Sequence, residues 1–184
     1  ASHQQAAALI AQEKIAYLPC NLLHEEFQNW LMTKHTLGLR SPINTLLRLI
    51  APNNCAGVQS VFHPNYGKTH QAACALIGKE ALIMKGEGGE FEINPERTTQ
   101  CIFTHRDDIE KIPGIQPHFE GKHTEPNKQA LLDCWQKEVD EYGYHATLRT
   151  TAAVLMLKDK VLDFPQALVK ATDLWNKRNK SAFN

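Results

Sequence analysis

The chain has 184 residues, enough for one domain with a substantial core or for one domain with an appendage. Hydrophobic residues make up 42% and charged residues 22%, which excludes a disordered chain, and no apolar run approaches the roughly 20 residues that cross a bilayer. Lys and Arg together number 20, as do Asp and Glu, so the chain lacks the overall basic excess of many nucleic-acid-binding proteins. We therefore expect no membrane partner, and any basic surface has to be local.

The cysteines indicate a reducing environment. They are odd in number, widely spaced, and form no CxxC pair, which is typical of free thiols rather than of a disulfide framework. We predict free thiols and a cytoplasmic location from these five residues: Cys20, Cys55, Cys74, Cys101 and Cys134.

The first quarter of the chain shows apolar residues at helical spacing. Gly38 follows one such segment as a helix-ending glycine would, and Ser41 followed by Pro42 is a typical helix start. We predict helices over residues 3–14, 23–36 and 41–50, with a short strand over 15–19. Because the first residues already read as a helix, we also expect that a longer protein continues upstream.

The pattern then alternates between strands and helices, which favours βαβ crossovers and a mostly parallel sheet. We predict strands over residues 57–63, 80–85 and 98–105, and a helix over 66–78. Residues 106–126 are polar and rich in Pro and Gly, so we interpret them as a long excursion or an edge segment. Three C-terminal helices follow, over residues 127–141, 144–158 and 164–177. We expect one α/β domain over 1–184, with the helices of 127–177 as a C-terminal layer.

A glycine-rich stretch, KGEGGEFE (85–92), follows the predicted strand 80–85. In open α/β sheets, ligands bind outside the carboxyl ends of the strands. Glycines allow backbone amides to approach an anion, and carboxylates can hold Mg²⁺ together with substrate phosphates. The pattern alone favours an acidic, solvated turn that joins two strands, because lone glycine-rich strings are weak motifs.

Three blocks resemble anthranilate phosphoribosyltransferases, members of glycosyl transferase family 3. LGLRSPINTLLRLIAP (37–52) is similar to the family's LGxRTxFNLLGPLTNP, GVQSVFHPNY (57–66) to a strand and turn, and KGEGGEFEI (85–93) to HGxGGLDEI. A weaker similarity links LRTTAAVLML (148–157) to a buried helix near the family's C-terminus. The combination of KGEGGE with NPER (94–97) resembles a divergent paralogue group, some members of which bind nucleic acid.

The resemblance implies a fold of the nucleoside phosphorylase and phosphoribosyltransferase type, with helices on both faces of a mostly parallel sheet. The family's N-terminal helical domain and its GTGGD motif have no counterpart in the chain. The resemblance therefore implies the C-terminal α/β portion of a larger two-domain protein, which would form a homodimer.

The metal loop departs from the family pattern. Phe91 stands at the position of the family's Asp, Glu92 keeps the Glu, and Lys85 replaces the His. A phenyl ring cannot coordinate Mg²⁺. The resemblance implies a magnesium site made of Glu90 and Glu92.

The resemblance implies two sets of site residues. For substrate binding, including phosphoribosyl pyrophosphate or another phosphorylated ligand, these are Arg40, Asn44, Lys85, Gly86, Gly88 and Gly89. For a nucleic-acid groove, they are Arg40, Arg48, Lys68, Lys85 and Arg149.

Two hypotheses of function follow. The first is a phosphoribosyltransferase-like glycosyltransferase with an altered loop, inactive as the present chain because half of the phosphoribosyl pyrophosphate site is missing. The second is a non-enzymatic nucleic-acid-binding protein that keeps the same fold. No protein nucleophile is needed for phosphoribosyl transfer, so the sequence leaves open whether the protein is an enzyme.

Overall fold

The computed structural model describes residues 2–38, 42–50, 52, 54–86, 91–115, 119, 127–137 and 141–182. The chain divides into two compact units, Ala1–Ile50 and Ala51–Asn184, each of which is described by itself. Among the described helices, none is long and apolar enough to cross a membrane.

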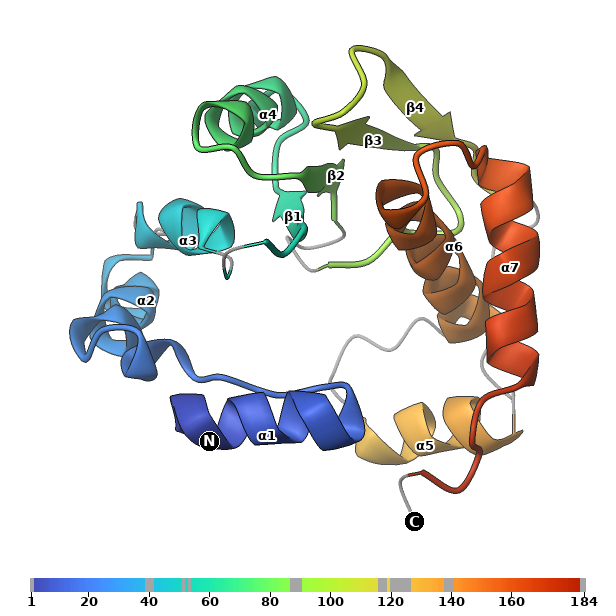
Figure 1. Cartoon of the computed structure of the whole chain (residues 1–184), viewed down its shortest axis with the longest axis horizontal. Helices are drawn as coiled ribbons and strands as arrows, with labels where there is room; N and C mark the ends of the chain where they lie inside the picture. The colour runs from blue at the N-terminus through green and yellow to red at the C-terminus, as the bar shows by residue number, and fades with distance from the viewer. Residues whose placement is uncertain are drawn as a thin grey trace. The chain divides into compact units, whose positions relative to one another are not determined.

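Unit 1 consists of short helices (Figure 1). A capping box between Ser2 and Gln5 starts the first helix, and Gly38 ends the second in the left-handed conformation, with φ 68°, as the sequence predicts. The strand predicted over 15–19 is wrong, because these residues join no ladder and Ile15 and Tyr17 are exposed. The elements are α1 (His3–Glu13), η1 (Cys20–Leu22), α2 (Glu26–Leu37), α3 (Ile43–Leu46) and η2 (Leu47–Leu49).

Unit 2 is built on a four-stranded mixed sheet with the order β1-β2-β3-β4. Its strands are β1 (Gly57–Val61), β2 (Ala81–Lys85), β3 (Thr99–Phe103) and β4 (Ile109–Ile112). Only β1 and β2 pair in parallel; β2 with β3 and β3 with β4 pair antiparallel. The predicted α/β class is confirmed, whereas the mostly parallel sheet is wrong. A parallel return needs a crossover, commonly a helix, and residues 91–98 before β3 contain none.

The edge strand β4 lies within the segment predicted as a polar excursion or edge. Among its four residues only Ile112 is buried, while Glu110 and Lys111 are charged. Charged, short strands are common at sheet edges because they discourage pairing with another chain. The edge interpretation is therefore confirmed for residues 109–112.

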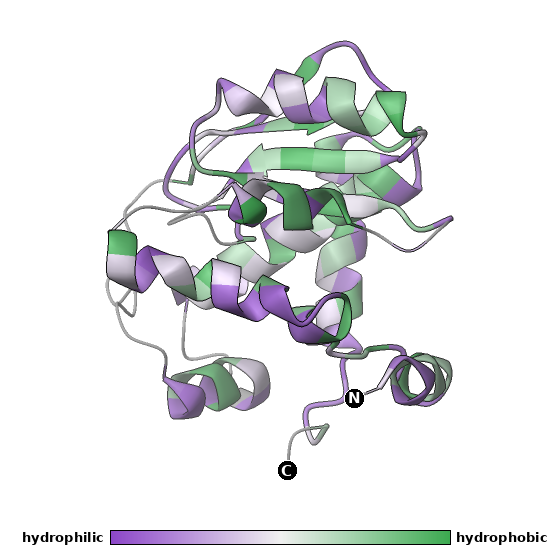
Figure 2. Cartoon of the chain, turned by 90° about the vertical axis from the view of Figure 1, so that its left-hand side faces the viewer, coloured by the Kyte–Doolittle hydropathy of each residue, from purple (hydrophilic) through white to green (hydrophobic). Residues whose placement is uncertain are grey.

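Helices cover both faces of the sheet, as predicted (Figure 1). On one face lies α4 (Tyr66–Leu76), where Gly67 brings the helix close to Ile102 and the buried His70 Nδ1 lies 2.8 Å from Gln59 Oε1. On the other face lie α6 (Glu141–Lys158) and α7 (Phe164–Asn176), preceded in the chain by α5 (Lys128–Lys137). Figure 2 shows one strand inside the sheet green along most of its length, whereas α4 carries both polar and apolar residues.

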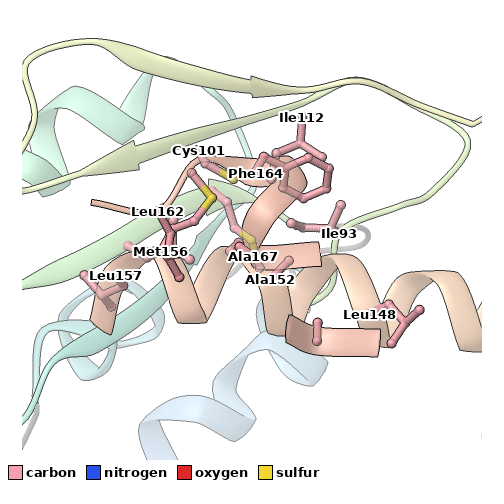
Figure 3. Packing of buried hydrophobic residues seen from close by; sticks show 14 of the residues in the cluster. Ile93, Cys101, Ile112, Leu148, Ala152, Met156, Leu157, Leu162, Phe164 and Ala167 are labelled. Atoms are coloured by element: carbon pink, nitrogen blue, oxygen red, sulfur yellow. The ribbon is translucent and has the colours of Figure 1, made fainter. Parts of the chain in front are cut away.

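The main hydrophobic core lies between the sheet and α6 with α7. Alternation along β2 directs Leu82 and Met84 into this core, where they join Met156 of α6 and Ala167 of α7. Figure 3 shows the side chains meeting around Cys101, Ile112 and Phe164. A capping box between Asp163 and Gln166 starts α7.

The five cysteines are free thiols, as predicted. Burial, with a smaller contribution from Glu110, raises the pKa of the Cys101 thiol to about 12.

Candidate functional site

The carboxyl ends of the parallel strands β1 and β2 meet at one edge of the sheet. Val61, the last residue of β1, pairs with Lys85, the last residue of β2. The chain turns after Val61 into the N-terminus of α4, and after Lys85 it continues into the buried Gly86 and the glycine loop. The exposed ammonium of Lys85 and the positive end of the α4 dipole therefore lie at the same edge.

The predicted site residues are divided between the two units. Lys85, Gly86 and Glu92 belong to unit 2, whereas the partly buried Asn44 and Arg48 belong to α3 and η2 of unit 1. Four predicted residues lie outside the described part of the chain: Arg40, Gly88, Gly89 and Glu90.

Two contacts from α6 fix the chain at Glu92 and Ile93, where the glycine-rich stretch ends. The buried Tyr142 donates its hydroxyl hydrogen to Glu92 Oε1, at 2.6 Å. The backbone amide of Ile93 donates to Thr150 Oγ1, at 3.0 Å. A hydrogen bond to a carboxylate is stronger than one between neutral groups, so Tyr142 sets the direction of the Glu92 side chain.

A cavity of about 430 Å³ adjoins Glu92. Phe91 and Glu92 form one wall and the α5 residues Leu131 and Cys134 another. The α6 wall bears the hydroxyls of Tyr142, Thr147, Thr150 and Thr151. A carboxylate among several hydroxyls in a largely apolar hollow is suited to fix the polar end of a small ligand.

The magnesium site implied by the resemblance lies only in part within the described residues, because Glu90 is outside them. Phe91 supplies no ligand atom, and Glu92 Oε1 already accepts a hydrogen bond from Tyr142. Within the described ranges, no group of three or more His, Cys, Asp or Glu residues is placed to hold a metal ion. Because Glu92 is the one predicted ligand that the structure describes, we assign no chemical step to Mg²⁺.

Arg149, a member of the predicted basic set, points into the interior. It is 4% exposed, its Nη2 donates to the Pro113 carbonyl, and its guanidinium lies 5.2 Å from the centre of the Phe164 ring. Burial lowers the pKa of Arg149. Arg149 therefore supports the core between α6 and α7 rather than a surface groove.

Aromatic residues follow β1 in the chain and precede the exposed Lys68 of α4. Lys68, in the first turn of α4, donates to Gln71 Oε1 and to the Asp107 carbonyl, both at 3.0 Å. Phe62 and Tyr66 are more than half exposed, and the ring of His63 lies 4.8 Å from Phe62 and 6.1 Å from Tyr66. The sequence analysis did not select these rings. The alternation of aromatic and basic residues from 62 to 68 is the signal that would have found them.

Two comparisons with known proteins bear on this arrangement, and no protein-family model matches the chain. The chain is 27% identical over 106 residues to the uncharacterized protein YbiB of Escherichia coli (strain K12), a match covering 56% of this chain and 33% of that protein. It also superposes on anthranilate phosphoribosyltransferase from Saccharomyces cerevisiae, solved with 4-fluoroanthranilate, with TM-score 0.77 and 16% identity.

The fold is therefore similar to that of the yeast anthranilate phosphoribosyltransferase. The superposition covers 96% of this chain and 54% of the yeast structure. The chain thus spans about half the length of the solved structure, and its match covers a third of the curated relative.

Proposed function

We propose that the chain is a phosphoribosyltransferase-like domain that binds a phosphorylated ligand at the carboxyl edge of β1 and β2. The observation that carries the proposal is the parallel pairing of Val61 with Lys85, which puts Lys85, Gly86 and the N-terminus of α4 at one edge. Backbone amides of glycine loops and of helix N-termini recognise phosphate oxygens, and Lys85 adds a point charge. The phosphoribosyltransferase-like fold makes phosphoribosyl pyrophosphate the first ligand to test.

Transfer chemistry is proposed for the whole protein, since the yeast enzyme is about twice as long as this chain. In this proposal Arg40 orients the acceptor, and the complete protein is a cytoplasmic homodimer.

The test is a calorimetric titration of the protein with phosphoribosyl pyrophosphate, in parallel with and without Mg²⁺. Lys85→Gln removes the charge at the edge and is expected to weaken binding about tenfold, which corresponds to about 1.4 kcal/mol. Lys111→Gln is the matched control, because Lys111 is an exposed lysine on the edge strand β4. Absence of heat at millimolar ligand in both titrations, or equal loss in the two variants, would contradict the proposal.

One observation favours nucleic-acid binding as the second candidate. Exposed Phe62 and Tyr66 follow β1 in the chain, and Lys85 lies at the end of the paired strand β2, beside the end of β1. Aromatic rings that stack on bases, combined with lysines that contact phosphates, are typical of single-strand binders. Burial of Arg149 removes one member of the predicted basic set, so this candidate rests on fewer charges than the sequence suggested.

Fluorescence anisotropy with a labelled oligonucleotide over rising salt distinguishes the two candidates. Binding through phosphates falls steeply with salt, and Phe62→Ala combined with Tyr66→Ala should weaken it further. Binding that is insensitive to salt and to both substitutions would exclude this candidate. Because this experiment uses an oligonucleotide, its outcome is independent of the calorimetric titration with phosphoribosyl pyrophosphate.

A further inference from the structure

A second cavity, of about 610 Å³, lies among α5, α6 and α7. It shares Leu131, Cys134 and Thr147 with the cavity beside Glu92, so the two hollows adjoin at these residues. Each has a volume typical of small-molecule sites.

The two hollows differ in chemistry. The first ends at the Glu92 carboxylate, the only carboxylate among its described lining residues, and at the hydroxyls of α6. The second is walled by Leu131, Leu132, Trp135 and Trp175, with Lys128 at its margin. The hollow beside Glu92 thus carries negative charge, whereas the hollow beside the two tryptophans is apolar and includes the cationic Lys128. A ligand with a cationic head and an apolar body would place its head at Glu92.

The aromatic wall is held in place before any ligand arrives. The rings of Trp135 and Trp175 meet edge to face, 5.7 Å apart at 77°. Arg178 lies 3.7 Å from the centre of the Trp175 ring and donates from Nε and Nη2 to the Trp135 carbonyl. Preorganised walls reduce the entropy lost when a ligand binds.

We propose that the adjoining hollows form one site for an amphipathic amine. The protonated amino group donates hydrogen bonds to Glu92, whose position Tyr142 fixes, and the hydrocarbon body lies against Trp135 and Trp175. A pyrophosphate would be repelled by Glu92, so this site is distinct from the proposed phosphate site at Lys85.

Three probes of equal chain length test the head group: octylamine, octanol and octanoate. Of the three tryptophans, Trp30 lies in unit 1, so a Trp30→Phe variant leaves Trp135 and Trp175 as the only indole reporters. We expect a saturable change in their emission with octylamine at a concentration at least tenfold below that needed for octanol, with octanoate weakest. No saturable change, or equal response to octanol and octylamine, would overturn the proposal.

Two pairs of titrations on variants locate the site. Glu92→Gln should bring octylamine to within about threefold of octanol while leaving the octanol response intact, which also shows that the variant is folded. Thr147→Phe fills the junction from an exposed position and should weaken all three probes, whereas Thr147→Ser should not. Retained amine preference in Glu92→Gln, or unchanged binding in Thr147→Phe, would place the amine elsewhere.

Discussion

His105, two residues after β3, is partly buried, and both of its ring nitrogens are shielded from solvent. Neither ring nitrogen has a hydrogen-bond partner among the described residues, and the ring lies 5.4 Å from that of Phe103. Burial, then the positive charges of Arg106 and Lys160, lowers the pKa of His105, against smaller opposite contributions from Glu80 and Asp108. Burial and the nearby Arg149 likewise lower the pKa of His145.

Stability should therefore fall in mild acid. A histidine whose pKa is lower in the folded state takes up more protons when unfolded, so its contribution is complete above about pH 6.5 and is lost as the pH falls toward the folded pKa. Urea unfolding at pH 7.5 and 5.5 measures this loss. His105→Asn should make the difference smaller, and His145→Asn should act in the same direction. An equal pH difference in the wild type and both variants would show that other groups carry it.

Glycines differ in what surrounds them, and the difference predicts the cost of adding a methyl group. A Cβ at Gly114 would lie 2.8 Å from the Glu96 carbonyl oxygen and 2.9 Å from the Arg97 amide nitrogen. Those are backbone atoms that cannot move alone. A Cβ at Gly67 would lie 2.6 Å from Ile102 Cδ1, which is the end of a side chain.

We expect Gly114→Ala to destabilise the protein by about 2–3 kcal/mol, as overpacking against rigid atoms does. The change at Gly67 should stay within about 1 kcal/mol, because alanine gains up to about 1 kcal/mol of helix propensity in α4. Urea midpoints of the two variants provide the measurement. A larger loss for Gly67→Ala than for Gly114→Ala would contradict this ranking.

At the level of elements, the sequence predicts where the strands lie along the chain better than it predicts their directions in the sheet. The apolar runs of β1, β2 and β3 are visible because both faces of these strands are covered. Strand direction depends on what connects the strands, and the glycine loop before β3 carries no periodic pattern. The sequence predicts a polar excursion or edge segment around β4 rather than a defined strand, because only one of the four residues of β4 faces the core.

The candidate site was predictable only in part. Glu92 follows from its place in the glycine-rich stretch, but its partner Tyr142 lies 50 residues away, in the first turn of α6 and before residue 144, where the sequence predicts that helix to begin. The sequence analysis also does not select Thr147 and Thr150 of the same helix. Their role depends on the face of α6 that meets the loop, which a weak amphipathic pattern does not reveal.

On the scale of the whole molecule, buried apolar residues are unevenly divided. Among the described residues of unit 1, only Ala6 and Ile43 are buried hydrophobics, whereas β2 alone contributes four consecutive buried residues to unit 2. Amides protected by few buried contacts exchange through low-energy local openings.

Backbone amides should therefore exchange at two ranges of rate, fast in unit 1 and slow in the core of unit 2. Peptides from α1 and α2 are expected to exchange at least a hundredfold faster than peptides from β2 and α6, since each factor of ten reflects about 1.4 kcal/mol of opening free energy. Mass spectrometry of peptic fragments after timed labelling measures both ranges. Uniform protection across the chain would mean that unit 1 owes its stability to contacts beyond those of its own residues.

The order of the sheet, in which each strand pairs with its neighbour in sequence, has a consequence for how the chain folds. Pairing neighbours closes short loops, and the entropy of closure grows with loop length. Folding rates across small proteins rise as contacting residues lie closer in sequence. We therefore expect the strands to pair in chain order from β1 to β4, because each strand pairs with one that is close to it in sequence. The contact between Ile93 and Thr150, 57 residues apart, can form only after α6 docks, so the site beside Glu92 should be among the last parts to take shape.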